Sequence, residues 1–344
     1  MIGSELLKVR REYKRTNYKM EIGSFIELDI RDTGEYFSGV ASMARLNSAR
    51  AGIYHACRLY NCSSLYIPYY MCPMVGKFLT RKGIKVKSYH ISETFEPVNL
   101  IQEPDAAVVL VNYFGILSNN LIKGLSSKYK NVIIDNSPAF YSYPIAGCFS
   151  VYSPRKFFGV PDGCYVIGEN ATRLTHEYSQ DCSSETSSFL LKRIEFGSSA
   201  VYNERMKNEE RIDNSDILNM SILTKALLNG IDYSKIKAKR QSNFYFAHDL
   251  YEKFNLFDPT LFIDNECVPM VYPLVVEESD LVDRFKEKHI YTGRWWKHVL
   301  LEVPDDSFEA RMSKFLVPIP IDQRYGKEEL NYCFNVFYNG YKSK

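Results

Sequence analysis

The stretch of sequence that decides the fold runs over residues 131–168, NVIIDNSPAFYSYPIAGCFSVYSPRKFFGVPDGCYVIG. Its apolar run at residues 132–134 is typical of a buried strand, and we expect that strand to end at the carboxylate of Asp135. A second short strand is predicted over residues 148–152, ahead of Lys156. The stretch therefore predicts two strands, one ending in an acid and the other followed by a lysine among aromatic residues and glycines.

Apolar runs of strand length alternate with helical patterns on the N-terminal side of this stretch. Strands are predicted at residues 22–29, 64–68, 84–89 and 106–112, and helices at residues 49–59, 70–82 and 117–129. Ser48 is the expected N-cap of the first helix, and Gly83 ends the second. Strands separated by helices imply right-handed crossovers and a mostly parallel sheet covered on both faces. In such sheets ligands bind beyond the carboxyl ends of the strands, where Asp135 is expected.

The chain changes character after about residue 170. Residues 176–216 are polar, serine-rich and charged, which favours helices and loops, and a long helical region is predicted at residues 221–254. Strand and helix patterns from residue 269 onward describe a small domain. We predict an α/β fold with an N-terminal segment (1–34), a large domain with a mostly parallel sheet between helices (35–240) and a small C-terminal α+β domain (241–344).

Composition excludes several classes of protein. The 344 residues are 45% hydrophobic and 24% charged, with a net charge of +2, so no overall field favours nucleic acid or an anionic membrane. The basic segment in residues 1–20 is expected to be a solvated helix rather than a nucleic-acid arm. No signal peptide and no run of about 18 apolar residues is found, so no membrane span is predicted. The eight cysteines have no CxxC or metal-ligand spacing, which favours a reduced, cytoplasmic protein without a metal.

Three groups could together hold a pyridoxal ring and its phosphate. Lys156 lies beside Arg155 and two phenylalanines, neighbours that lower an amine pKa and so favour a Schiff base. An acid at the position of Asp135 could keep a pyridine nitrogen protonated. A helix that begins at Ser48 offers free N–H groups to a phosphate. Each group alone is more often structural, as a surface lysine, a turn aspartate and a plain N-cap, so the prediction depends on all three together.

Four segments resemble the DegT/StrS-type aminotransferases, pyridoxal-phosphate enzymes of fold type I that act on nucleotide-linked keto sugars. LNSARAGIYHACRL resembles the family's phosphate-binding loop and helix, and LYIPYYMCPMV resembles its VPxYTC strand and turn. NVIIDNSPAF resembles the IIEDAAQAF segment, and FSVYSPRKFFGVPDGCYV resembles the FSFxxxKxxxxGEGG segment that bears the Schiff-base lysine. The tail, IYTGRWW with FLVPIPIDQRYGKEEL, is similar to the family's small-domain ending. The resemblance spans about residues 35–340.

The resemblance implies a pyridoxal 5'-phosphate cofactor and a role for each matching residue. It makes Lys156 the Schiff-base lysine and proton shuttle, and Asp135 the partner of the ring nitrogen. It also implies that Ser48, Ala49 and Arg50 hold the phosphate together with a serine of the FSF segment.

That serine is Ser150, which composition alone would leave as a polar residue in a strand. The usual stacking aromatic of the family falls near Cys72, so stacking is left to Tyr69, Tyr70 or Tyr113, and we assign it to Tyr70. Pro138 stands where the family has Gln or His near the ring hydroxyl, and it cannot donate a hydrogen bond.

Two further segments depart from the family pattern. Residues 161–164, PDGC, replace the GEGG turn, and the GYNxR segment has no clear counterpart around residues 203–220. Elsewhere, Arg294, Trp295 and Trp296 suit either an anionic or sugar ligand or simple core packing.

The resulting prediction is an aminotransferase that moves an amino group, from glutamate in most of the family, to a nucleotide-linked keto sugar. The setting implied is amino-sugar or surface-polysaccharide biosynthesis, in a homodimer with shared active sites. Two alternatives remain open. One is a pyridoxal-dependent sugar dehydratase on the same scaffold, although such enzymes usually replace the lysine with His. The other is a catalytically silent homologue that serves as a binding or regulatory protein.

Overall fold

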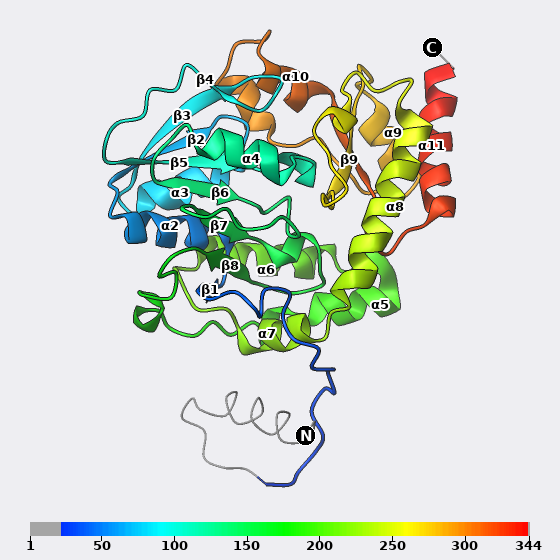
Figure 1. The fold of residues 1–344 in the computed structure, drawn as a ribbon. Helices are drawn as coiled ribbons and strands as arrows, with labels where there is room; N and C mark the ends of the chain where they lie inside the picture. The colour runs from blue at the N-terminus through cyan, green and yellow to red at the C-terminus, as the bar shows by residue number, and fades with distance from the viewer. Residues whose placement is uncertain (1–21, 343–344) are drawn as a thin grey trace.

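The computed structural model describes residues 22–342, and an eight-stranded sheet forms the centre of their larger part (Figure 1). The strands follow the order β1-β8-β7-β6-β5-β2-β3-β4. Their bounds are β1 Met43–Leu46, β2 Ser64–Pro68, β3 Lys85–Ile91, β4 Pro97–Val98, β5 Ala106–Val111, β6 Val132–Asp135, β7 Phe149–Tyr152 and β8 Cys164–Ile167. The five strands from β7 to β3 in that order are parallel, whereas β1, β8 and β4 pair antiparallel with their neighbours.

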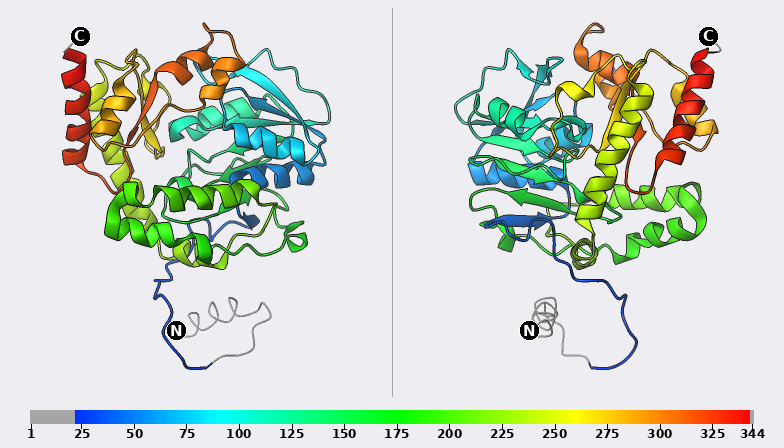
Figure 2. Two further views of the ribbon diagram at one scale, coloured as in Figure 1. Left: turned by 180° about the vertical axis from the view of Figure 1, so that it is seen from behind. Right: turned by 45° about the vertical axis from the view of Figure 1, so that its right-hand side comes forward.

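Helices cover both faces of the sheet, so central strands such as β5 are apolar at every position (Figure 2). The helices are α2 Ala49–Tyr60, α3 Pro73–Arg81, α4 Asn119–Ser126, α5 Ser188–Ala200, α6 Tyr202–Asn214 and α7 Ile222–Asn229. Helices α2 and α3 lie on one face and α4 on the other (Figures 1 and 2). A Cβ added at Gly52 of α2 would come within 2.6 Å of the Cys164 Sγ and 3.0 Å of Val151, so α2 packs very closely on β7 and β8.

The C-terminal part is built on a two-stranded antiparallel sheet of β9 Val271–Val275 and β10 Leu316–Pro320. Helices α8 Tyr233–Tyr251, α9 Leu281–Glu287, α10 Phe308–Phe315 and α11 Lys327–Lys342 complete it. The boundary predicted between residues 240 and 241 falls inside α8, which runs from beside the large sheet to the small one (Figure 2). The division into a large and a small domain remains our proposal.

Two apolar clusters form the core. The larger one runs from the strands of the main sheet into the small sheet. The second, which we call the aromatic cluster, contains Phe37, Phe140, Tyr152, Phe157 and Phe158. Phe157 and Phe158 directly follow Lys156, so the turn that carries Lys156 is anchored in buried rings.

The prediction of a mostly parallel α/β sheet is confirmed, and the strand ending at Asp135 has the predicted bounds. The strand predicted at residues 22–29 is wrong: these residues pair with no strand, and Ile22, Phe25 and Ile26 are exposed. The edge next to β8 is occupied instead by β1. The helix predicted within residues 1–20 lies outside the described residues. Within residues 22–342, no helix is both long and apolar enough to cross a bilayer.

Candidate functional site

Asp135 ends β6 at the carboxyl edge of the sheet. It pairs in register with Val151 of β7, whose side chain contacts Gly52 of α2, so Asp135 faces the α2 side of the sheet. The carboxylate Oδ1 accepts a hydrogen bond from the Ser137 N–H at 2.9 Å. Burial raises the pKa of Asp135, while the Ser137 hydrogen bond and the positive charge of Lys156 oppose that rise. The predicted acid and lysine therefore interact electrostatically.

Lys156 lies in a one-turn 3₁₀ helix, Pro154–Lys156, that follows β7. Its side chain is accessible to solvent, but protein surrounds the ammonium group closely enough to desolvate it. This desolvation, followed by the charge of Arg155, lowers the pKa of Lys156, and Cys72 and Glu209 partly oppose the change. A lysine with a lowered pKa is more often an unprotonated nucleophile, as the sequence predicted from its neighbours.

The part of the site predicted to bind the cofactor phosphate is the N-terminus of α2. Ser48 caps the helix by accepting a hydrogen bond from the Ala51 N–H at 3.4 Å. Ala49 and Arg50 occupy the first turn, whose N–H groups have no acceptor within the helix. The Arg50 guanidinium is buried, and its Nη2 donates to the Asp213 Oδ1 at 2.5 Å, whereas its Nη1 has no hydrogen-bond partner within residues 22–342. Arg50 can thus approach a phosphate only with Asp213 beside it.

Ser150 lies on the other face of the sheet from Asp135. Strand β7 pairs Ser150 with Ile134 and Val151 with Asp135, and successive side chains of a strand point to opposite faces. Ser150 is fully buried, and its hydroxyl accepts a long hydrogen bond of 3.5 Å from the Ile145 N–H. In the pattern FSFxxxK the serine precedes the lysine by five residues, but Ser150 precedes Lys156 by six. A shift of one residue moves a side chain to the opposite face of the sheet, so the register does not bring Ser150 to the N-terminus of α2, where the phosphate is predicted to bind.

Tyr70 is fully buried just before α3. Its carbonyl accepts a hydrogen bond from the Tyr113 hydroxyl at 2.7 Å, and its ring lies edge-on to Trp296 with centroids 4.6 Å apart. The Tyr70 hydroxyl has no hydrogen-bond partner in the part of the chain that the structure describes. Trp295 and Trp296 pack against the main core, so core packing explains the two rings. The Arg294 Nη2 donates to the Glu278 carbonyl, and its buried Nη1 has no hydrogen-bond partner among the described residues.

Helix α6 supplies charged groups that sequence reasoning missed. Glu209 forms an ion pair with Arg155, and the charges of Glu209 and Arg205 both act on Lys156. Asp213, the partner of Arg50, belongs to the same helix. Most residues of α6 are charged or polar, which is typical of a solvated helix, so no local signal distinguishes these residues.

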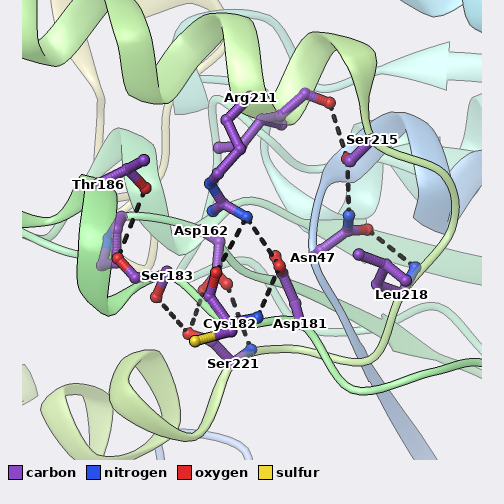
Figure 3. A network of polar contacts seen from close by, with 12 residues as sticks. Asn47, Asp162, Asp181, Cys182, Ser183, Thr186, Arg211, Ser215, Leu218 and Ser221 are labelled. Carbon is purple, nitrogen blue, oxygen red and sulfur yellow. Dashed lines mark hydrogen bonds and ion pairs between the residues drawn. The ribbon is translucent and has the colours of Figure 1, made fainter.

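The turn that follows Lys156 is fixed by a polar network (Figure 3). Asp162, which replaces the glutamate of the GEGG pattern, is fully buried and accepts hydrogen bonds from the Ser221 hydroxyl (3.0 Å) and N–H (3.2 Å). Asp181 is held by Arg211 at 2.7 Å in the same network. Burial raises the pKa of Asp162 to about 6, and the neighbouring Asp181 adds to the rise. The network connects the lysine turn to the start of α7, which Ser221 caps.

No protein-family model and no curated protein sequence matches the chain. Solved structures of sugar aminotransferases do match it. The putative sugar aminotransferase Spr1654 from Streptococcus pneumoniae, in its PLP form, is 13% identical and has a TM-score of 0.61, with 88% of this chain and 87% of that one covered. A DegT DnrJ EryC1 StrS aminotransferase from Brucella abortus is 12% identical with a TM-score of 0.59, covering 89% and 87%. DesI, solved with its TDP-sugar product, is 14% identical with a TM-score of 0.58, covering 87% and 80%.

These matches extend over almost the whole chain at very low identity. They show that the chain has the fold of these aminotransferases. The predicted site residues Asp135, Lys156 and Ser48 all lie where loops and helix ends meet the sheet.

Proposed function

We propose that the protein is a pyridoxal-phosphate-dependent aminotransferase that transfers an amino group to a keto sugar. One observation carries the proposal. Lys156, a lysine with a lowered pKa in an accessible position, lies close enough to the buried Asp135 for its positive charge to oppose the rise that burial causes in the pKa of that acid. A lysine and an acid in this relation are the two groups that a pyridoxal ring requires at its opposite ends.

The residues present fit the cofactor at three points. Asp135 offers a carboxylate for the ring nitrogen, Lys156 an amine for the aldehyde, and the first turn of α2 free N–H groups for the phosphate. Among the described residues, buried polar atoms without a hydrogen-bond partner occur in two of the predicted cofactor residues, the Arg50 Nη1 and the Tyr70 hydroxyl. Unsatisfied buried atoms are costly, which supports a ligand that would satisfy them. We leave Ser150 out of the proposed site because it faces the opposite side of the sheet.

Pyridoxal phosphate, when bound, supplies an aldehyde that condenses with amines and a ring that accepts electron density. The chain supplies the rest. Lys156 would hold the cofactor through its Nζ and would carry a proton on the same atom during the transfer. Asp135 would keep a proton on the ring nitrogen, because an ionised carboxylate stabilises a neighbouring cation.

The substrate is proposed to be a nucleotide-linked keto sugar, and glutamate the amino donor, within amino-sugar or surface-polysaccharide biosynthesis. Support comes from the structural likeness to sugar aminotransferases, among them DesI with its TDP-sugar product. We also propose a homodimer with shared active sites. The apolar side chains of Leu191, Ile194 and Phe196 on α5 are exposed, which supports α5 as part of the surface that contacts the second subunit. All eight cysteines are free, which supports a cytoplasmic setting.

The test is covalent trapping of the cofactor. Purified protein mixed with pyridoxal phosphate should gain a visible absorption band, and borohydride followed by peptide mapping should locate the cofactor on Lys156. Lys156→Ala should lose both, while a substitution at the exposed Lys130, Lys130→Ala, should keep both. Loss of the band on addition of glutamate separates an aminotransferase from a dehydratase. If the wild-type protein forms no band, the binding or regulatory alternative replaces our proposal.

A further inference from the structure

The side chain of Gln323 connects the turn after β10 to the residue next to Lys156. Its Nε2 donates to the Phe157 carbonyl at 2.8 Å, and its Oε1 accepts from the Arg240 Nε at 3.1 Å. Each end of the amide therefore has a partner of the opposite hydrogen-bonding type, which fixes its orientation. This contact joins positions 166 residues apart in the chain.

Arg240 holds the same phenylalanine by its ring. The guanidinium carbon lies 4.5 Å from the centroid of Phe157, and Arg240 is only 2% exposed. Its Nη1 donates to the Met270 carbonyl at 3.1 Å. Burial lowers the pKa of Arg240 to about 10, so the group still carries its charge at neutral pH. A buried cation is costly to keep, and a cation–π contact with a desolvated ring contributes to its stabilisation.

Helix α8 holds the turn that presents Gln323. Asn243 lies one helical turn after Arg240, and its Nδ2 donates to the carbonyls of Ile321, Asp322 and Tyr325 at 3.1, 3.2 and 3.0 Å. Three carbonyls bonded to one amide group leave the backbone around Gln323 little freedom. Gln323 therefore reaches Phe157 from a fixed base.

The element that receives this support is weak by itself. The 3₁₀ turn Pro154–Lys156 consists of three residues. Its backbone hydrogen bonds run from the Lys156 N–H to the Ser153 carbonyl (3.2 Å) and from the N–H groups of Phe157 and Phe158 to the Pro154 carbonyl (3.0 and 2.9 Å). A single helical turn is unstable without external contacts. Its orientation therefore depends on outside contacts: Glu209 holds Arg155 by an ion pair, and Phe157 is held by both its ring and its carbonyl.

We propose that Gln323 and Arg240 are positioning residues that fix the turn of Lys156 and so the place of its Nζ relative to Asp135. The proposal rests on the proposed function, since Lys156 needs a fixed orientation only if it reacts. It assigns to the C-terminal part of the chain a direct role in placing the reactive amine. Neither residue is proposed to touch substrate or cofactor.

The test uses Gln323→Glu, which keeps the shape and the acceptor for Arg240 but removes the donor to Phe157. Gln241→Glu is the matched control, because the Gln241 amide also donates to backbone carbonyls, those of Asn265 and Cys267, away from Lys156. Without cofactor, we expect hydrogen exchange in the peptide 154–160 to rise about fivefold in Gln323→Glu, the equivalent of one net hydrogen bond, and to stay unchanged in the control.

With cofactor, Gln323→Glu should alter the visible circular dichroism of the bound ring and lower kcat roughly 10- to 100-fold at a KM within about twofold of wild type. If Gln323→Glu fails to fold, Gln323→Met replaces it with the same expectations. Unchanged exchange, or raised exchange with unchanged dichroism and kcat, overturns the proposal. If wild-type protein traps no cofactor, the proposed function fails, and with it the reason to position Lys156, whatever the exchange shows.

Discussion

Asp162 gives the sharpest prediction of pH dependence. Its carboxyl has an ordinary pKa of 3.8 in the unfolded chain, and burial beside Asp181 raises it to about 6 in the folded protein. Between these two values the folded state binds more protons than the unfolded state. The contribution of Asp162 to the free energy of unfolding must therefore fall as pH rises from about 4 to about 6. Below and above this interval the contribution is constant.

The size of the effect follows from the same interval. At about 1.4 kcal/mol per pH unit, the separation between 3.8 and about 6 corresponds to ~3 kcal/mol lost at neutral pH. Asp162→Asn removes the titration. In wild type, the Ser221 N–H and the Ser221 hydroxyl each donate to one oxygen of the Asp162 carboxylate. The asparagine amide of the variant can still accept from the Ser221 N–H through its oxygen and donate to the Ser221 hydroxyl through its nitrogen. We expect the variant to be more stable than wild type at pH 7.5 by up to ~3 kcal/mol, and equally stable near pH 4.

The assay is thermal unfolding of both proteins from pH 4 to 7.5, compared as the difference in midpoint. At about 2.1 cal/mol/K per residue over 344 residues, ~3 kcal/mol corresponds to roughly 4 °C. Asp305→Asn serves as the control, since Asp305 is strongly exposed and should change the midpoint by less than about 1 °C at every pH. A difference between wild type and Asp162→Asn that does not vary with pH, or a less stable variant at pH 7.5, would refute the reasoning.

Three further substitutions test other parts of the structure. Gly115→Ala should destabilise the protein by more than about 3 kcal/mol in thermal unfolding, because Gly115 has a φ of +74° and a Cβ there would lie 2.5 Å from the Pro138 carbonyl oxygen. Asp135→Asn should lower kcat on the order of 10²–10³-fold while the cofactor is still trapped, since the ring nitrogen loses its anionic partner; an unchanged kcat would remove Asp135 from the mechanism. Tyr70→Phe should leave the stability of the cofactor-free protein unchanged or raised by ~1 kcal/mol, because its hydroxyl has no partner, but should weaken cofactor binding about fivefold in an equilibrium titration. Equal affinity for the cofactor would show that the hydroxyl does not contact it.

Local sequence signals predicted where on the helices and strands Ser48, Asp135 and Lys156 of the candidate site lie. Ser48 caps α2 as its position before a helical pattern indicated, and β6 ends at Asp135 where the apolar run ends. Lys156 lies in the turn that its proline and glycine neighbours suggested. Caps, turns and buried runs are decided within a few residues, so one sequence suffices to find them. The regular alternation of strands and helices likewise predicted the parallel sheet.

Contacts between distant segments were decided only by the tertiary structure. The strand register placed Ser150 on the face away from Asp135. Successive side chains of a strand alternate between the two faces of the sheet, so a shift of one residue changes the face. Folding also brought Asp213 to Arg50 across 163 positions and Gln323 to Phe157 across 166. By itself, therefore, the sequence determined which elements form and where the acid, the lysine and the helix cap lie on them. Only packing decided which charges surround these groups and what holds the lysine turn in place, because those partners are chosen by proximity in space.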